Sequence, residues 1–312
     1  MAHRFHNLDP TRRPHGAKAI LRWGIWDPLR GRRRTAPPGR PAPRVEPDLD
    51  LIHEASQRTR LTWIGHASFL LQLGGRALLL DPVFSTRVGW VYPRYGQPGL
   101  VADQLPRLAA ILVTHNHYDH LDLPSLRALS DEVPLIVPSG LGEYLRHRVR
   151  QPLVELAWWQ SVEVAGLEIT LVPTQHWSRR RIMDTNHTLW GGYVVAADGL
   201  AFYHASDTSW FDGFREIGLR FPGLQVAMLP IGGYRPGWFM EHYHLNPEQA
   251  GQAFETLGAR WLLPMHWGAF QLTDEPLSEP AERIRSWWEQ ARFGSDRHLG
   301  ILAVGETVVP ED

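Results

Sequence analysis

The segment THNHYDH at residues 114–120 constrains this 312-residue chain more than any other part of it. It directly follows the apolar run AAILV, which predicts a buried β-strand with the histidines and the aspartate in the loop at its carboxyl end. Alternate residues His115 and His117 would face one cation, while Asp119 and His120 would reach a second one. Imidazole nitrogens and a carboxylate are donors that zinc accepts. An isolated histidine is more often structural or solvated, but this cluster favours a metal site.

Three further apolar runs end at a potential metal ligand in the same way. The runs LEITLVP, LAFYHA and RWLLPM lead to His176, Asp207 and His266, respectively. Two metal ions need more ligands than the first motif supplies. We therefore expect four strand ends to converge at one edge of a sandwich and to assemble five histidines and two aspartates.

The order HxHxDH, then His, then Asp, then His resembles the metallo-β-lactamase superfamily. Shorter phrases resemble its N-acylphosphatidylethanolamine-hydrolysing phospholipase D branch, and the likeness covers roughly residues 60–270. These phrases are LTWIGHAS (61–68), DPVFS (81–85), QHW (175–177), LWGG (189–192), DT (207–208), PIGGY (230–234), WFM (238–240) and HWG (266–268). The resemblance and the alternation of strand and helix patterns imply an α+β fold, the four-layer αββα metallo-β-lactamase sandwich.

The resemblance also implies two Zn²⁺ ions per chain, although other divalent transition metals could replace them. Three histidines would hold the first ion, an aspartate and two histidines would hold the second, and one aspartate would bridge both. In that order, these residues are His115, His117 and His176; Asp119, His120 and His266; and Asp207. A hydroxide shared by two ions about 3.5–4 Å apart would then attack phosphorus or a carbonyl carbon.

Other residues near these ligands are candidates for direct or supporting roles. Asp119 could orient the hydroxide, and His244, which matches a histidine near the active site of the phospholipase branch, could donate a proton to the leaving alkoxide. The Tyr118 hydroxyl could face substrate, with packing of its ring as an equal alternative. His66 and Asp81 resemble residues that orient metal ligands.

The chain divides by composition into a basic, Pro-rich N-terminal arm at residues 1–45 and a metallo-β-lactamase-fold hydrolase domain at residues 46–312. In the first 44 residues, eleven Lys or Arg face only Asp9 and Asp27, a net charge of +9 against −10 for the remainder. Seven prolines and four glycines there argue against a core of its own. Its segment ILRWGIW could pack back on the domain, the more common outcome, or contact an anionic membrane.

Composition excludes few classes of protein. The overall charge of −1 offers no field that would attract nucleic acid, so no nucleic-acid partner is expected. The absence of cysteine excludes disulfides, thiolate ligands and cysteine nucleophiles. No apolar run near the start suits a secretory signal, so we expect a cytoplasmic protein with peripheral membrane contact as an option. Composition does not predict the oligomeric state.

The leading interpretation is a binuclear zinc-dependent hydrolase, a phosphodiesterase that cleaves a small-molecule or lipid phosphodiester. A lactone, carboxyl-ester or β-lactam hydrolase on the same centre is the alternative. A nucleic-acid-processing nuclease ranks third because of the neutral charge. Several of the fourteen tryptophans neighbour the ligands and would suit an acyl chain, although large aromatic residues most often form core.

Local patterns predict three supporting elements. Residues 61–80 predict a β-meander whose second turn is Gly-Gly. A helix is expected after Asp122 as N-cap, with three leucines as its buried stripe. A second helix is expected to begin at the N-cap Asn246 and to end at Gly258.

Overall fold

Alternate residues of strand β3 (Arg76–Leu80) enter two different cores. Leu78 and Leu80 pack between two sheets, whereas Ala77 and Leu79 pack toward helices on the outer face of their own sheet. Successive side chains of a strand point to opposite faces, so a strand that is apolar throughout requires a sheet covered on both sides.

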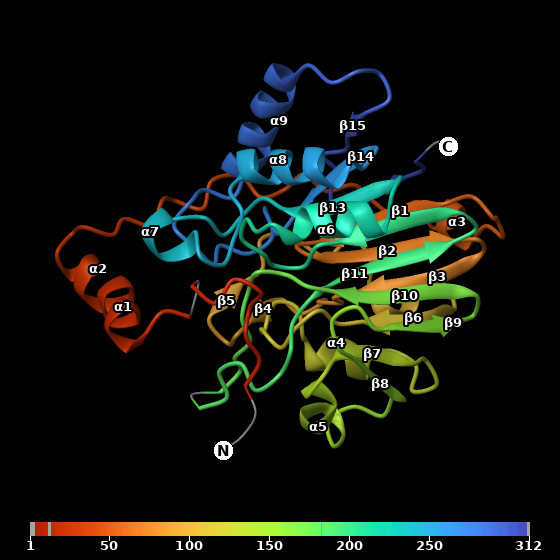
Figure 1. Cartoon of the computed structure of the whole chain (residues 1–312), viewed down its shortest axis with the longest axis horizontal. Helices are drawn as coiled ribbons and strands as arrows, with labels where there is room; N and C mark the ends of the chain where they lie inside the picture. The colour runs from red at the N-terminus through yellow and green to blue at the C-terminus, as the bar shows by residue number, and fades with distance from the viewer. Residues whose placement is uncertain (1–3, 12–13, 182, 311–312) are drawn as a thin grey trace.

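Two seven-stranded sheets lie face to face in Figure 1. The computed structural model describes residues 4–11, 14–181 and 183–310, so parts of the predicted arm and the last two residues lie outside it. In order across the first sheet, the strands are β16 (Thr307–Val308), β1 (Arg60–Gly65), β2 (Ser68–Leu73), β3, β6 (Leu108–Leu112), β7 (Leu135–Pro138) and β8 (Leu153–Leu156). In order across the second, they are β15 (His298–Leu299), β14 (Trp261–Met265), β13 (Val226–Pro230), β12 (Leu200–His204), β11 (Gly192–Ala197), β10 (Leu167–Val172) and β9 (Ser161–Val164).

Strands β10, β12 and β14 run in the same direction through the second sheet. Strands β10 and β12 both pair antiparallel with β11, while β12, β13 and β14 pair in parallel. Their carboxyl ends therefore reach one edge, as the sequence predicted. In the first sheet, β1, β2 and β3 form the expected meander, with Gly74 (φ 56°) and Gly75 (φ 73°) in the left-handed region that a tight hairpin turn needs.

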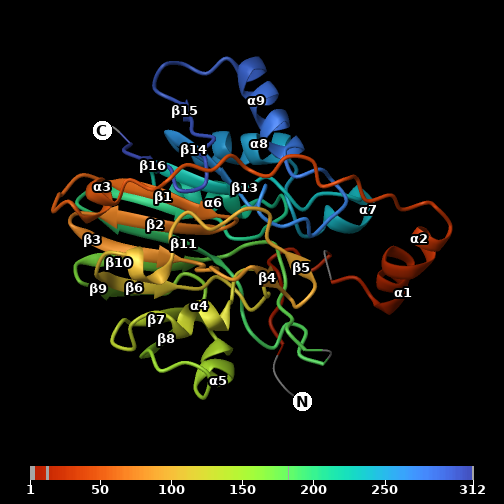
Figure 2. The same ribbon diagram turned by 180° about the vertical axis from the view of Figure 1, so that it is seen from behind.

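Helices cover the outer faces of both sheets, which confirms the αββα arrangement (Figures 1 and 2). Helices α4 and α5 lie beside the first sheet, and α6, α8 and α9 lie beside the second. The helical segments are α1 (Ala17–Leu21), η1 (Arg22–Trp26), α2 (Asp27–Leu29), α3 (Leu49–His53), η2 (Ala102–Gln104), α4 (Leu123–Arg127), α5 (Leu141–Leu145), α6 (Gly213–Arg220), α7 (Gly237–Met240), α8 (Pro247–Leu257) and α9 (Glu279–Ala291). A separate strand pair, β4 (Arg87–Val88) and β5 (Tyr92–Pro93), lies near the arm. No helix in the described ranges is long and apolar enough to cross a bilayer.

Helix α8 begins and ends where the sequence predicted. The Asn246 side chain accepts a hydrogen bond from the Gln249 amide, and the Gln249 side chain accepts one from the Asn246 amide. Gly258 ends the helix with φ 70°. These contacts satisfy amides that a helix start leaves unpaired.

Helix α4 begins after Asp122 at the N-cap, as predicted, but it ends before Leu129. Asp122 occupies the N-cap position, but its carboxylate accepts hydrogen bonds from the hydroxyls of Ser85 and Ser125 instead of a backbone amide. Leu129 is buried but lies beyond the helix end. The three leucines therefore do not form one helical stripe.

The described part of the arm packs back on the domain. Its helical segments α1, η1 and α2 lie beyond the end of the sandwich where α7 and β5 are found (Figure 1). Trp23 stacks on Phe239 of α7 at 5.0 Å between ring centroids, and Arg33 forms an ion pair with the buried Asp274. The domain boundary near residue 45 stays a prediction.

Candidate metal centre

Four strand ends around the expected ligands hold residues with left-handed backbone. His66 (φ 55°), Asp81 (φ 41°), Ser206 (φ 59°) and His266 (φ 61°) follow β1, β3, β12 and β14, respectively. This conformation costs a residue other than glycine about 1–3 kcal/mol, and such costs concentrate at functional sites. The strained turns direct side chains into the space between the strand ends.

Three histidines and Asp207 form the first donor group. His117 Nδ1 lies 2.9 Å from His115 Nε2 and 3.2 Å from His176 Nε2. Asp207 Oδ2 lies 3.7 Å from His176 Nε2 and 4.0 Å from His115 Nε2. Tetrahedral zinc with bonds of about 2.0–2.1 Å separates its ligand atoms by about 3.3 Å. The four side chains therefore have the spacing that such an ion requires.

A second donor group shares Asp207 with the first. His266 Nε2 lies 3.1 Å from Asp207 Oδ1 and 3.4 Å from Asp119 Oδ2. His120 Nε2 lies 3.3 Å from Asp207 Oδ2 and 3.7 Å from Asp119 Oδ2. The two imidazole nitrogens are buried, and neither has a hydrogen-bond partner. The two nitrogens and the two carboxylates face a common space, which fits a cation there.

The structure brings all seven predicted ligands together, and the two donor groups share Asp207. Asp207, His244 and His266 form a further set of side chains that could hold a metal ion. Their identity as ligands stays a prediction. His66, which the sequence suggested as an orienting residue, lies within the second group with Nε2 3.0 Å from Asp119 Oδ2.

Buried hydrogen bonds orient the side chains from behind. Asp81 Oδ2 lies 2.7 Å from His120 Nδ1, and the same carboxylate accepts from the Thr114 amide and hydroxyl. His115 Nδ1 contacts the hydroxyls of Thr114 and Ser206 at 3.0 and 3.3 Å. Such partners fix the tautomer and the ring orientation of a metal-binding histidine.

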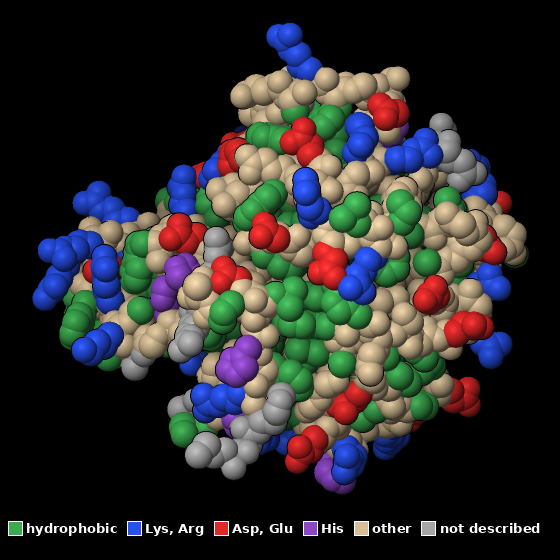
Figure 3. Space-filling model, in the orientation of Figure 1, with side chains coloured by type: hydrophobic (Ala, Val, Ile, Leu, Met, Phe, Trp, Pro, Cys, Tyr) green, Lys and Arg blue, Asp and Glu red, His purple; other side chains and the backbone are tan. Residues whose placement is uncertain are grey.

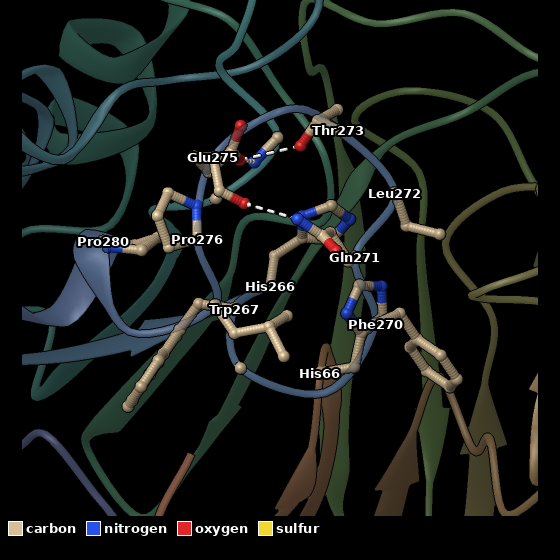
Figure 4. A pocket seen from close by; sticks show the side chains of 14 residues that line it. His66, His266, Trp267, Phe270, Gln271, Leu272, Thr273, Glu275, Pro276 and Pro280 are labelled. Carbon is tan, nitrogen blue, oxygen red and sulfur yellow. Dashed lines mark hydrogen bonds between the residues drawn. The ribbon is translucent and has the colours of Figure 1, made fainter. Parts of the chain in front are cut away.

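The loop that follows His266 encloses a small pocket of about 20 Å³ (Figure 4). Its buried Glu275 accepts hydrogen bonds from the amides of Gly233 and Arg235 and from the Thr273 hydroxyl. This carboxylate holds the loop that contains Gly232 and Gly233 against His266. A Cβ on Gly232 would lie 2.2 Å from the His266 carbonyl oxygen, so the Gly-Gly phrase permits a backbone approach that other residues would block.

The two groups differ in protonation. Burial lowers the pKa of His115 well below its ordinary value and lowers the pKa values of His117 and His176 to about 4 and about 3, so these rings are neutral at pH 7. Burial alone would also lower the pKa of His266, but the Asp207 and Asp119 carboxylates raise it to about 9. The same two carboxylates raise the pKa of His120 well above its ordinary value, against the effect of burial.

This difference predicts that the two metal ions expected from the sequence leave at different pH values. Below about pH 9, a cation entering the second group must displace a proton from His266, so its affinity should fall as the pH falls. The first group should keep its ion down to about pH 4, the pKa of His117, because protonation of this ring competes with the metal below that pH. Elemental analysis after equilibration in a metal buffer at pH 6 and at pH 9 measures this directly. Loss of both ions at the same pH would contradict the prediction.

A cavity of about 600 Å³ opens onto both groups. It is lined by His117, Asp119, Asp207, His244 and His266 of the site, by Tyr118, Trp177 and the arginines at 179–181, by Phe239, Met240 and Tyr243, and by Pro14, His15, Ile20 and Trp23 of the arm, among others. Trp190 and Trp267, which neighbour ligands in the sequence, are buried in the core.

Three catalytic candidates from the sequence line the cavity, namely His244, Tyr118 and Asp119. His244 Nδ1 lies 4.0 Å from Asp207 Oδ2, which places it beside the donor groups. The Tyr118 hydroxyl donates to the Arg180 carbonyl at 3.2 Å, so contact with substrate would compete with this bond. The Arg180 guanidinium donates to the carbonyls of Asn116 and Leu121 and thereby holds the loop that carries His117, Asp119 and His120. The catalytic roles of His244, Tyr118 and Asp119 stay predictions.

Comparison with known families decides the class of the protein. Residues 76–267, more than half of the chain, match the family described as "Beta-lactamase superfamily domain". The chain belongs to the metallo-β-lactamase superfamily. It is therefore a metal-dependent hydrolase of this superfamily, and its relatives place it in the phospholipase D-like branch.

Two curated relatives carry the name of that branch. "N-acyl-phosphatidylethanolamine-hydrolyzing phospholipase D 1" of Caenorhabditis elegans is 32% identical over 78% of this chain and 74% of its own length. A Saccharomyces cerevisiae relative, named as the mitochondrial N-acyl-phosphatidylethanolamine-hydrolyzing phospholipase D, is 34% identical over 74% of this chain and 52% of its own length. The metallo hydrolase Igni18 of Ignicoccus hospitalis shares the fold, with a TM-score of 0.61 and 24% identity over 80% of this chain and 97% of that chain.

Sequence patterns missed the contacts made by the backbone and by the arm. The Tyr243 carbonyl accepts a hydrogen bond from His176 Nδ1 at 3.0 Å, and the side chain of Asn7 binds the backbone of His176. A carbonyl carries no side-chain signal, and Asn7 is separated from His176 by 169 positions. No motif in this chain connects them.

Proposed function

We propose that this superfamily member is a binuclear zinc-dependent phosphodiesterase that cleaves a lipid or lipid-like phosphodiester. One observation carries the proposal: two donor groups share Asp207 and open onto a single, mostly apolar cavity of about 600 Å³ with arginines in its wall. The names of the two curated relatives support the choice of substrate class.

The chain supplies ligands, orientation and charge to this reaction. His115, His117 and His176 would hold one zinc ion, the second donor group would hold the other, and Asp207 would contact both. Bound zinc would supply a water of lowered pKa and positive charge opposite the developing negative charge.

Asp119 is suited to orient the attacking water. Burial opposes its ionisation, but His120, His266 and His66 lower the pKa of Asp119 well below its ordinary value, so it remains a carboxylate at neutral pH. One of its oxygens is held by His66. The carboxylate can therefore accept a hydrogen bond from the attacking water without leaving its position.

The cavity wall suits a phosphodiester that carries an apolar tail. The Arg179 guanidinium lies over the Trp177 ring at 5.1 Å and lines the cavity, where it can bind a phosphate oxygen. Phe239, Met240 and Trp23 offer an apolar wall to an acyl chain. An apolar wall with a few polar groups is typical of small-molecule sites.

A substrate panel on zinc-loaded protein tests this function. We expect cleavage of N-acylphosphatidylethanolamine to a phosphomonoester and an alcohol, and slower cleavage of diesters without a tail. Removal of the metal by a chelator should abolish the activity, and added zinc should restore it. Efficient opening of lactones, carboxyl esters or β-lactams with no cleavage of any phosphodiester would contradict the proposal and favour the alternative.

We further propose that the mouth of the cavity contacts an anionic membrane. Exposed apolar side chains gather on segments that border it, and these are Leu21, Ile25, Trp26 and Leu29 of the arm, Trp90 and Val91 between β4 and β5, and Met183. Lys and Arg side chains surround the arm, at the left of Figure 3. Apolar residues beside basic ones are typical of a surface that binds anionic lipid.

Replacing Ile25 and Leu29 together by Glu is expected to weaken binding to mixed phosphatidylcholine–phosphatidylglycerol vesicles by at least about tenfold, since each charge near such a surface is worth about 1 kcal/mol. Turnover of a soluble chromogenic diester should stay unchanged, because neither side chain lines the cavity. Leu219→Glu is the matched control, since Leu219 is 76% exposed on α6. Vesicle co-sedimentation measures the difference, and equal binding by all three proteins would contradict the proposal. These variants are a sharper test than deletion of residues 1–44, which would also remove contacts to His176.

A further inference from the structure

The side chain of Asn7 binds both polar groups of the His176 backbone. Asn7 Nδ2 donates to the His176 carbonyl at 2.8 Å, and Asn7 Oδ1 accepts from the His176 amide at 3.2 Å. The same Oδ1 accepts from the Trp190 indole at 3.2 Å. One amide side chain therefore connects the arm, a predicted metal ligand and a fully buried tryptophan.

These contacts satisfy the backbone amide and carbonyl of His176, which lies beyond the end of its strand. Strand β10 ends at Val172, so His176 lies in the loop beyond the sheet, where no neighbouring strand satisfies its backbone. A buried backbone amide and carbonyl both require partners. The carboxamide of Asn7 offers one donor and one acceptor side by side, which fixes the peptide in position and in rotation.

The arm reaches His176 by a second route, through Tyr243. The His15 amide donates to the Tyr243 hydroxyl, and the His15 ring contacts the Phe239 carbonyl at 2.8 Å and stacks on the Phe239 ring. The Tyr243 carbonyl in turn accepts from His176 Nδ1. Asn7 thus holds the backbone of His176, while His15 supports the residue that holds its ring.

The neighbouring contacts hold this part of the arm along the site. The Phe5 amide donates to the Asn186 carbonyl at 2.8 Å, and the Gln175 side chain donates to the Asp9 carbonyl at 3.4 Å. Asn7 lies between these two anchor points. These contacts hold the chain on both sides of Asn7.

We propose that the N-terminal segment is a built-in part of the metal centre and that Asn7 is a positioning residue for His176. The inference rests on the metal-ligand role of His176 in the proposed function. It assigns to the arm a role beyond membrane contact, because displacement of Asn7 would release the peptide that carries one of the three histidines of the first donor group.

Asn7→Ala in the full-length protein tests this role. We expect the affinity of one of the two metal ions to fall by about 10–100-fold, the range typical of lost partners of metal ligands. Competition with a chromogenic chelator measures the affinity, and the visible spectrum of the Co²⁺-substituted protein should change because the ligand geometry changes. Asn7→Asp keeps the acceptor and loses the donor, so its affinity should lie between those of the wild type and Asn7→Ala. Leu8→Ala is the control, because the neighbouring Leu8 is exposed, and it should match the wild type.

A purely structural contact would give a different result. If Asn7→Ala lowers the melting temperature but both variants keep wild-type metal affinities and the wild-type Co²⁺ spectrum, the inference is wrong while the proposed function stands. If the wild-type protein binds no metal at all, the proposed function and this inference both fail.

Discussion

Asp207→Ala is expected to abolish hydrolysis and to reduce the metal content below two ions per chain. Asp207 is the side chain common to both donor groups, with Oδ2 near His176 and His120 and Oδ1 3.1 Å from His266 Nε2. Its loss removes a potential ligand from each group and one of the carboxylates that raise the pKa values of His120 and His266. Turnover of a phosphodiester and elemental analysis of the purified protein measure both effects.

The neighbouring Asp212 provides a matched control for this substitution. It is exposed at the start of α6, five positions further along the chain. Asp212→Ala should keep full activity and full metal content. If Asp207→Ala retained two tightly bound ions, Asp207 would not be a shared metal ligand, and the prediction would be contradicted. We expect the same loss of turnover for Asp119→Ala.

His244→Ala is expected to lower the rate by about 10²–10⁴-fold and to leave the metal content intact, because general acid catalysis contributes an effect of that size. His244 faces the cavity, and its ring stacks on His266 at 5.4 Å between centroids. Burial lowers the pKa of His244 to about 3, so the ring is neutral at pH 7 in the protein without metal or substrate. A bound phosphate anion would favour the protonated ring and could make it a donor.

The leaving group provides an internal check on this role. A diester with a p-nitrophenol leaving group needs little help from an acid, so His244→Ala should lose much less activity on it than on an alkyl diester. The exposed His53 is the control position, and His53→Ala should behave as the wild type. Loss of metal from His244→Ala, or full activity on the alkyl diester, would show that His244 is not the proton donor.

The sequence predicted the elements whose side-chain pattern repeats within a short stretch. The apolar runs before His115, His176, Asp207 and His266 form strands, and their carboxyl ends lie at one edge. These strands were predictable because a strand buried on both faces must be apolar throughout. Helix α8 was predicted for a similar reason. Its N-cap, proline and terminal glycine are all local signals.

Sequence patterns did not predict the contacts between segments that lie far apart in the chain. The Arg180 guanidinium donates to the backbone carbonyls of Asn116 and Leu121, and a backbone carbonyl gives no side-chain signal in the sequence. Asp122 looked like a helix cap but binds Ser85, which lies 37 positions away. Asn7 sits in a segment that composition describes only as basic and Pro-rich. Tertiary hydrogen bonds of this kind depend on the packed fold and not on a local pattern.

The central claim is that two metal ions bind in the two donor groups and share Asp207. Anomalous diffraction from crystals of the zinc-replete protein, recorded on both sides of the zinc absorption edge, tests it most directly. We predict two zinc peaks about 3.5–4 Å apart, one among His115, His117 and His176 and the other beside His120 and His266, with Asp207 in contact with both. A single peak in the first group, with no metal at Asp119, His120 and His266, would contradict the binuclear centre.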